Sequence, residues 1–197
     1  MYSALLRTVN FAAAKHRDQR RNDLPKSPYI NHPINVATLL SEVGKIDDVV
    51  TLQAALLHDT VEDTNTTFEE LEAEFGVEVT NVVREVTDDK SLPKVQRKML
   101  QIEHSPHMSP RAKLVKLADK LHNLSDEPPL SWDAPRVQGY YVWAYHVVAG
   151  LRGTNAPLEA ALDMFFASSF YRDSQLYPCL PSGDLGVALE EYLTSLK

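Results

Sequence analysis

The chain contains a single cysteine, Cys179, and this scarcity excludes an internal disulfide and a zinc site built from several cysteines. No apolar run approaches the ~20 residues that a membrane-spanning helix needs, and the N-terminus lacks the long apolar core of a secretory signal. No segment sustains the apolar–polar alternation of a strand, so we expect little or no sheet. Basic residues are in deficit: the net charge of −7 argues against a general nucleic-acid surface.

What is present fits one globular domain in the cytoplasm. The 197 residues are 44% hydrophobic and 24% charged, which is typical of a chain that folds around one core. The N-terminus is basic enough to leave a mitochondrial address open, although Asp18 and Asp23 weaken that interpretation. The oligomeric state is left open as well, a homodimer included.

Apolar residues recur at helical spacing along almost the whole chain, which predicts an all-α fold. The expected helices cover residues 3–20, 33–43, 48–59, 67–75, 77–86, 93–104, 110–124, 134–151, 155–166 and 185–196. We expect residues 1–167 to form the domain and residues 168–197 to form a C-terminal extension, a loop followed by one short helix. The extension contains no recognisable chemistry.

Four separated residues are predicted to hold one divalent metal ion. They are His32 in Pro28-Tyr-Ile-Asn-His-Pro33, the pair His58 and Asp59, and Asp119 in Lys116-Leu-Ala-Asp-Lys120. Two imidazoles and two carboxylates suit an octahedral metal such as Mn²⁺, Fe²⁺ or Mg²⁺ better than tetrahedral zinc. The alternative for Asp119 is an ordinary salt bridge to a neighbouring lysine, but the apolar residues around it disfavour a fully solvated position.

Glu62 and Asp63 each follow a residue of the His58-Asp59 pair by four positions. We therefore expect these four polar groups on one face of one continuous helix. Burying so many ionisable groups is costly unless a cation or a substrate satisfies them. A bound metal can polarise a phosphoryl oxygen and lower the pKa of water, and Glu62 and Asp63 could orient or deprotonate that water. The combination predicts a metal-dependent phosphohydrolase.

Basic side chains near these motifs are candidates for binding a polyphosphate, which needs countercharge. Arg21 belongs to a cluster that precedes His32, and Lys94 belongs to a second cluster. For each of these residues the alternative is an ordinary solvated helix face.

Three further residues are candidates for the substrate pocket. Asn123 lies one turn beyond Asp119 and could bind a base or a sugar, or simply make a hydrogen bond at the end of its helix. Arg136 and Tyr140 are four residues apart and could close the pocket, or form only a packed pair. The other histidines, His122 among them, are expected to be structural or surface residues.

Five stretches carry a resemblance to a known family. They are Pro28-Tyr-Ile-Asn-His-Pro33, Ala54-Ala-Leu-Leu-His-Asp-Thr-Val-Glu-Asp-Thr64, Glu85-Val-Thr-Asp-Asp-Lys90, Ala112-Lys-Leu-Val-Lys-Leu-Ala-Asp-Lys120 and Leu151-Arg-Gly-Thr-Asn155. Together they resemble the HD-domain hydrolases of the RelA/SpoT group, in particular the stand-alone small alarmone hydrolases, the metazoan SpoT homologues. The resemblance covers residues 3–167.

The resemblance implies an all-α HD-domain helical bundle with one Mn²⁺ held by the four predicted ligands. It implies that Glu62 and Asp63 are the catalytic acidic pair. It also implies that the pocket residues bind the nucleotide; these are Arg21, Lys94, Asn123, Arg136 and Tyr140. The implied reaction removes the 3′-diphosphate from guanosine 3′,5′-bis(diphosphate) (ppGpp), giving GDP and pyrophosphate, and serves starvation responses.

The sequence leaves other functions open. NADPH 2′-phosphatase is an alternative principal activity, because both substrates present a phosphorylated secondary ribose hydroxyl. A nucleotide-binding sensor is an alternative of another class, which the presence of Glu62 and Asp63 disfavours. Departures from the family pattern at Asn22, Ser125 and the short proline-rich loop 127–135 affect the expected substrate contacts rather than the metal ligands.

Overall fold

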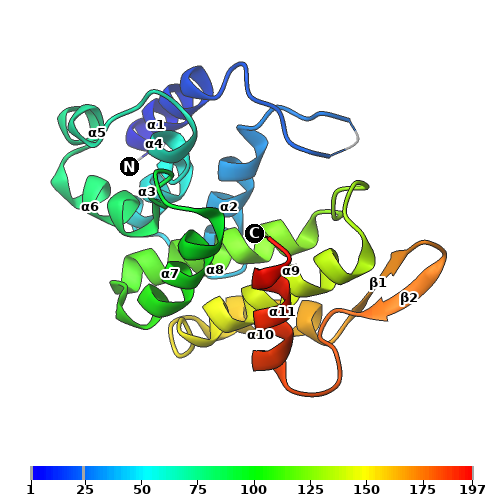
Figure 1. Cartoon of the computed structure of the whole chain (residues 1–197). Helices are drawn as coiled ribbons and strands as arrows, with labels where there is room; N and C mark the ends of the chain where they lie inside the picture. Colours follow the sequence, from blue (N-terminus) through cyan, green and yellow to red (C-terminus); the bar gives the residue numbers. More distant parts are fainter. Residues whose placement is uncertain (1, 24, 197) are drawn as a thin grey trace.

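A computed structural model of the chain describes residues 2–23 and 25–196, and helices dominate it (Figure 1). The helices are α1 (Tyr2–Lys15), α2 (Asn31–Glu42), α3 (Val49–Leu57), α4 (Thr60–Asp63), α5 (Phe68–Phe75), α6 (Val77–Val86), α7 (Lys94–His104), α8 (Pro110–Ser125), α9 (Ala134–Ala149), α10 (Ala156–Phe166) and α11 (Leu185–Thr194), with a 3-10 turn at Ser105–His107. The prediction of an all-α fold is confirmed, and the first helix ends five residues earlier than expected, at Lys15 rather than at position 20.

Side-chain caps explain where several helices begin. Thr67 accepts a hydrogen bond from the amide of Glu70 at the start of α5, as its capping pattern predicts. Ser109 accepts one from the amide of Ala112 at the start of α8, where Pro110 occupies the first helical position. Each cap satisfies an amide that has no partner within its own helix.

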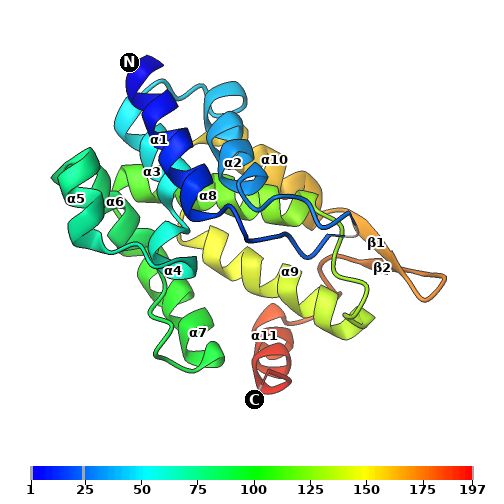
Figure 2. The same cartoon turned by 90° about the horizontal axis from the view of Figure 1, so that it is seen from above.

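Helix α8 is the centre of the bundle, in contact with α2, α3, α6, α9 and α10 (Figure 2). Its apolar face is fully buried, and the buried residues include Val115, Leu117, Ala118, Leu121 and Leu124. Burying each of these larger side chains stabilises the fold by roughly 1.5–3 kcal/mol. The polar residues of α8 that lie between them, Asp119 above all, are thereby carried into the interior.

The C-terminal extension differs from the expected plain loop and helix. Residues Ser169–Arg172 (β1) pair antiparallel with Gln175–Pro178 (β2), and the hairpin projects from one edge of the bundle (Figure 1). Asp173 and Ser174 form its two-residue turn with φ values of 50° and 62°, the left-handed conformations that such turns require. The loop predicted before the last helix thus contains a hairpin that the sequence did not predict, because strands of four residues are too short to show a clear period.

The predicted last helix is confirmed as α11, which packs along α9. Within the part of the chain that the structure describes, no helix combines the length and apolarity needed to cross a membrane.

Candidate functional site

The turn between α3 and α4 carries two of the predicted metal ligands. Helix α3 ends at Leu57, His58 and Asp59 lie in the turn, and α4 starts at Thr60. The prediction of one continuous helix through this region is therefore wrong. Side chains satisfy the freed carbonyl groups at the break: the Thr60 hydroxyl donates to the Leu57 carbonyl at 2.6 Å, and His58 Nδ1 lies 2.8 Å from the Ala55 carbonyl.

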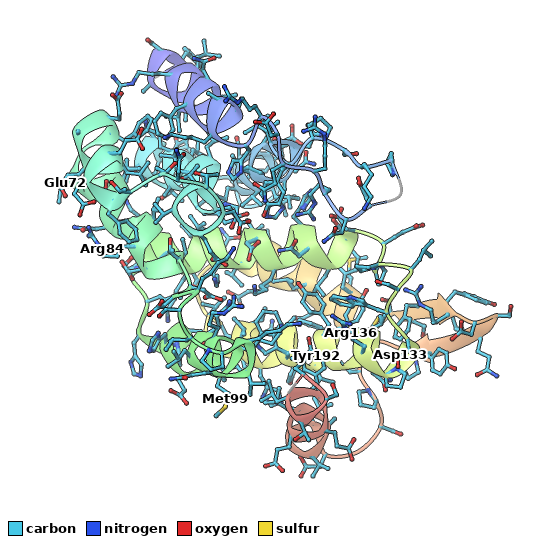
Figure 3. All side chains as sticks on the ribbon, turned by 45° about the horizontal axis from the view of Figure 1, so that its top comes forward. Glu72, Arg84, Met99, Asp133, Arg136 and Tyr192 are labelled. Carbon is cyan, nitrogen blue, oxygen red and sulfur yellow. The ribbon has the colours of Figure 1, made fainter. Side chains whose placement is uncertain are left out.

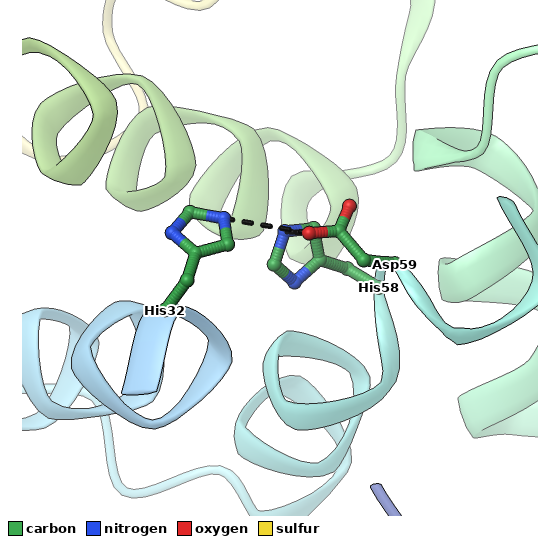
Figure 4. A group of neighbouring side chains, drawn as sticks. All are labelled: His32, His58 and Asp59. Atoms are coloured by element: carbon green, nitrogen blue, oxygen red, sulfur yellow. Dashed lines mark ion pairs between the residues drawn. The ribbon is translucent and has the colours of Figure 1, made fainter. Parts of the chain in front are cut away.

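Three predicted ligands converge, with His32 from α2 and His58 and Asp59 from the turn between α3 and α4. His32, His58 and Asp59 each bring one ligand atom to within 4.8 Å of the others (Figure 4). Asp59 Oδ2 lies 3.5 Å from His32 Nε2 and 3.1 Å from His58 Nε2. Both imidazoles are buried, and both present Nε2 to the Asp59 carboxylate.

Asp119 brings the second carboxylate from α8. Its Oδ1 lies 3.3 Å from His32 Nε2 and 3.7 Å from His58 Nε2. On its other side Oδ2 accepts a hydrogen bond from Lys120 Nζ at 3.1 Å. Asp119 therefore makes both of the contacts that the sequence offered as alternatives. It pairs with the neighbouring Lys120, and it faces both imidazoles of the cluster.

One specific observation indicates that these donor atoms suit a divalent metal ion. His58 Nε2 is buried and has no hydrogen-bond partner among the described residues, although Asp59 Oδ2 is close to it. When Nδ1 of His58 donates its proton to the Ala55 carbonyl, the lone pair of Nε2 points toward carboxylate oxygens, and that arrangement is unfavourable without a cation between them. Two imidazole nitrogens and two carboxylates around that point are ligands that Mn²⁺, Fe²⁺ and related ions accept.

The electrostatics of the cluster lead to the same conclusion. Burial opposes a charge on His58, but the carboxylates of Asp59 and Asp119 outweigh it and raise the pKa of His58 to about 10. Burial likewise opposes the charge on Asp59, yet the two imidazoles hold the pKa of this carboxyl below its ordinary value. The field at the centre of the cluster therefore favours positive charge, whether a proton or a metal ion.

Two residues that support the ligands were not assigned this role from the sequence. The hydroxyl of Tyr29 donates to Asp59 Oδ2 at 2.6 Å. His122 Nδ1 lies 2.9 Å from His32 Nδ1. The available signal was spacing, because His122 follows Asp119 by three residues and so lies on the same side of α8. Such outer contacts fix the orientation of metal-binding side chains.

Glu62 and Asp63 lie beside the cluster on α4. The backbone amide of Asp88 donates to Glu62 Oε2 at 3.2 Å, and the side-chain amide of Gln19 donates to Asp63 Oδ2 at 3.2 Å. Lys90 Nζ forms an ion pair with Asp63 and lies 3.9 Å from Glu62 Oε1. Both carboxylates are thus oriented by neighbours while about a fifth of each side chain stays accessible, since both are 20% exposed.

A cavity of about 390 Å³ opens next to this pair. Its lining includes Asp63 and three of the predicted substrate residues, Arg21, Asn123 and Tyr140. Both ends of the Asn123 amide already have partners. Its Nδ2 donates to Asp119 Oδ1 at 2.6 Å, and its Oδ1 accepts from Arg21 at 3.3 Å. The cavity is thus connected to the His/Asp cluster through Asn123, and also through Tyr29, which lines it and donates to Asp59.

The other two predicted substrate residues lie outside that lining. Arg136 stacks on Trp132, with its guanidinium carbon 4.7 Å from the ring centroid, and lines a groove between α9 and α11. Lys94 lies at the start of α7, where burial, Arg136 and Arg97 lower its pKa. A role of either residue in substrate binding stays a prediction.

The fold and the buried His/Asp cluster define a helical phosphohydrolase of the HD type, and comparison with known proteins supports that class. The model of the HD domain family matches residues 8–136. A MESH1 guanosine-3′,5′-bis(diphosphate) 3′-pyrophosphohydrolase from Xenopus tropicalis is 62% identical over 82% of this chain and 92% of that protein. The Homo sapiens MESH1 protein is 59% identical over the same shares of the two chains.

Solved structures give the same result. The structure of a metazoan orthologue of SpoT, which hydrolyses ppGpp and plays a role in starvation responses, matches with a TM-score of 0.81 at 54% identity, over 83% of this chain and 93% of that one. The crystal structure of lmo0812 from Listeria monocytogenes matches with a TM-score of 0.55 at 30% identity, over 71% of this chain and 98% of that one. The chain therefore belongs to the HD-domain family and, within it, to the MESH1 group.

Proposed function

We propose that this protein hydrolyses guanosine 3′,5′-bis(diphosphate) (ppGpp) to GDP and pyrophosphate in a metal-dependent reaction. The observation that carries the proposal is the buried cluster of two imidazoles and two carboxylates, in a chain 62% identical to a named ppGpp pyrophosphohydrolase. The adjoining cavity of about 390 Å³ has the size and the polar lining that a nucleotide needs.

The proposed cofactor is one Mn²⁺ per chain, held by His32, His58, Asp59 and Asp119. The mixed nitrogen and oxygen donors support an ion of this type. When bound, it supplies Lewis acidity, which stabilises charge on phosphoryl oxygens and lowers the pKa of water.

Glu62 and Asp63 are proposed to orient the attacking water and to take its proton. Burial first, then Asp88 and Asp59, raises the pKa of Glu62, which makes it a better proton acceptor than an exposed glutamate. The water oxygen forms a bond to the phosphorus beside ribose O3′, the O3′–P bond breaks, and O3′ takes up a proton. GDP and pyrophosphate then leave.

The remaining phosphates need countercharge, which Arg21, Lys94 and Arg136 are proposed to supply. Arg21 has the clearest position, because it lines the cavity together with Asn123 and Tyr140. Nearer to the cluster, Lys120 is buried with its ammonium group at Asp119. Cations at the cavity wall and at the cluster suit a substrate that carries two diphosphates.

The test compares kcat/KM for ppGpp and NADPH in the same Mn²⁺ buffer. We expect ppGpp to be the better substrate and the activity to disappear with a chelator and return with Mn²⁺. A higher kcat/KM for NADPH would instead make 2′-phosphatase chemistry the principal activity.

Two variants connect that activity to the cluster. His58→Ala removes a proposed ligand and should abolish hydrolysis, whereas His107→Ala changes an exposed histidine and should leave it intact. Absence of ppGpp hydrolysis in the wild-type protein, or full activity without metal, would contradict the proposal.

A further inference from the structure

The loop between α8 and α9 forms one wall of the 390 Å³ cavity. Asp126, Glu127, Pro128, Pro129 and Trp132 line the cavity from this side. The loop is short and rich in proline, and it is one of the places where the sequence departs from the family pattern. How it keeps its shape therefore bears directly on the substrate that the cavity accepts.

Prolines limit what the loop can do to hold itself. Pro128 and Pro129 have no amide hydrogen to donate, so their segment must be fixed through its carbonyl groups. Arg172 at the end of β1 supplies the donor: its Nη2 donates to the Pro128 carbonyl at 3.2 Å and to the Pro129 carbonyl at 3.4 Å. The C-terminal hairpin thus holds a loop more than forty positions earlier in the chain.

The held loop in turn fixes side chains at the cavity. The Trp132 amide donates to the same Pro129 carbonyl at 2.9 Å. The Trp132 ring packs edge-on against Tyr140, with the ring centroids 5.5 Å apart, and the Arg136 guanidinium stacks above it. A movement of Pro129 would therefore shift Trp132 and, through it, two predicted substrate residues.

The rest of the extension supports the same wall from behind. Gln138 Nε2 donates to the Pro178 carbonyl of β2 at 2.8 Å, which ties the hairpin to α9. Tyr192 of α11 is buried against Gly139, and Asp133, Arg136 and Tyr192 line the groove between α9 and α11 (Figure 3). The family model ends at residue 136, so Gln138, the hairpin and Tyr192 all lie beyond it.

We propose that Arg172 is a positioning residue for substrate binding: the hairpin holds the 126–132 loop through it and thereby sets the affinity of the cavity for nucleotide. The inference rests on the proposed ppGpp hydrolysis for the identity of that nucleotide. It gives the 168–197 extension a role in substrate affinity that the sequence did not reveal.

The test uses Arg172→Gln, which removes the charge and shortens the side chain, and Arg172→Lys, which keeps the charge but loses the guanidinium group. Arg152→Gln is the matched control, because Arg152 forms an ion pair with Asp163 on α10 and does not line the cavity. Hydrogen–deuterium exchange should rise in peptides covering 126–133 for Arg172→Gln and stay unchanged in peptides covering 54–63. KM for ppGpp should rise roughly 5- to 10-fold with kcat within about twofold, less than the full effect of one charged hydrogen bond, because Arg172 acts on the cavity only through the loop. KM for Arg172→Lys should fall between the values for the wild type and for Arg172→Gln.

Binding without turnover separates this inference from the proposed function. In a Glu62→Gln background, the Kd for ppGpp measured by calorimetry should rise by the same factor when Arg172→Gln is added. If the wild type does not hydrolyse ppGpp but this shift in Kd appears, the proposed function fails and the role of Arg172 stands. Unchanged exchange in the loop, an unchanged Kd, no ppGpp binding at all, or a fall in kcat with KM constant would overturn the inference.

Discussion

His122 on α8 places its Nδ1 2.9 Å from Nδ1 of His32 on α2, so one imidazole supports another behind the metal cluster. His32 can turn Nε2 toward a metal only if its proton stays on Nδ1, where His122 accepts it. In that tautomer Nε2 of His122 carries the proton; it lies 3.0 Å from the Asn35 side-chain amide, and it donates to the amide oxygen when the amide group is flipped. Burial and then His32 lower the pKa of His122 to about 4, which keeps the ring neutral and able to accept.

Replacing His122 should therefore weaken the metal site without touching a ligand. His122→Phe keeps the ring volume and loses the acceptor, and we expect Mn²⁺ affinity to fall about 10- to 100-fold. Metal titration by calorimetry measures this directly, with the exposed His104→Ala as control. Unchanged affinity in His122→Phe would show that His32 needs no support.

The acidic pair gives a prediction about roles. Glu62→Gln should keep Mn²⁺ stoichiometry yet lose at least ~10²-fold in kcat, because an amide cannot take the proton of water. Metal analysis and steady-state kinetics on the same preparation test it, with Glu72→Gln on the exposed face of α5 as control (Figure 3). Loss of metal from Glu62→Gln would instead make Glu62 a ligand.

The pH dependence of the same residue has a defined sign. Burial, Asp88 and Asp59 raise the pKa of Glu62 above its ordinary value of 4.5, and the base must be deprotonated to act. The acid limb of kcat/KM should therefore fall as pH drops through a value above 4.5. A limb at or below the ordinary value would exclude Glu62 as the base.

Arg21 is expected to act on substrate phosphates. It is paired with Asp126 and stays at the cavity wall, where a phosphate can compete for its guanidinium. Arg21→Ala should lower kcat/KM for ppGpp about 10- to 100-fold, the scale of one charged hydrogen bond, and added salt should reduce that difference. Arg17→Ala is the control, because its pair with Asp18 is fully on the surface. An equal loss on a substrate with one phosphate would mean that Arg21 supports the fold.

A stability prediction concerns the cap of the helix that delivers His58. Burial opposes the charge on Asp48, but hydrogen bonds from Thr51 and Arg111 outweigh it and lower its pKa below 3.8. A lowered pKa stabilises the folded state above pH ~4, and that contribution is lost as pH falls through the folded value. Asp48→Ala should cost about 1 kcal/mol at pH 7 and progressively less below pH ~4 in urea unfolding. The exposed neighbour Asp47→Ala should change little, and an Asp48→Ala cost that is constant with pH would contradict the assignment.

Most of the predicted helices were correct because they depend on local signals, although the first ends early at Lys15 and the third is broken at His58. Thr67 caps α5 and Ser109-Pro110 starts α8 through contacts within four residues, which periodicity and capping rules capture. The proposed ligand set followed from residue types, because His32, His58, Asp59 and Asp119 carry donor atoms of the kind that divalent metals accept. The resemblance to the HD-domain hydrolases then connected these residues to a fold and a reaction.

Other features were decided only by tertiary structure. The contact of His122 with His32 joins helices that meet across 90 residues of chain, and no local pattern encodes such an approach. The hairpin depends on contacts with distant residues: Phe170 packs against Tyr141, and Arg172 donates to the Pro128 carbonyl. The amino-acid sequence by itself determined the helices and the chemistry of the ligands. Packing decided which outer residues orient those ligands and which segment forms the cavity wall, because both depend on contacts between segments far apart in the chain.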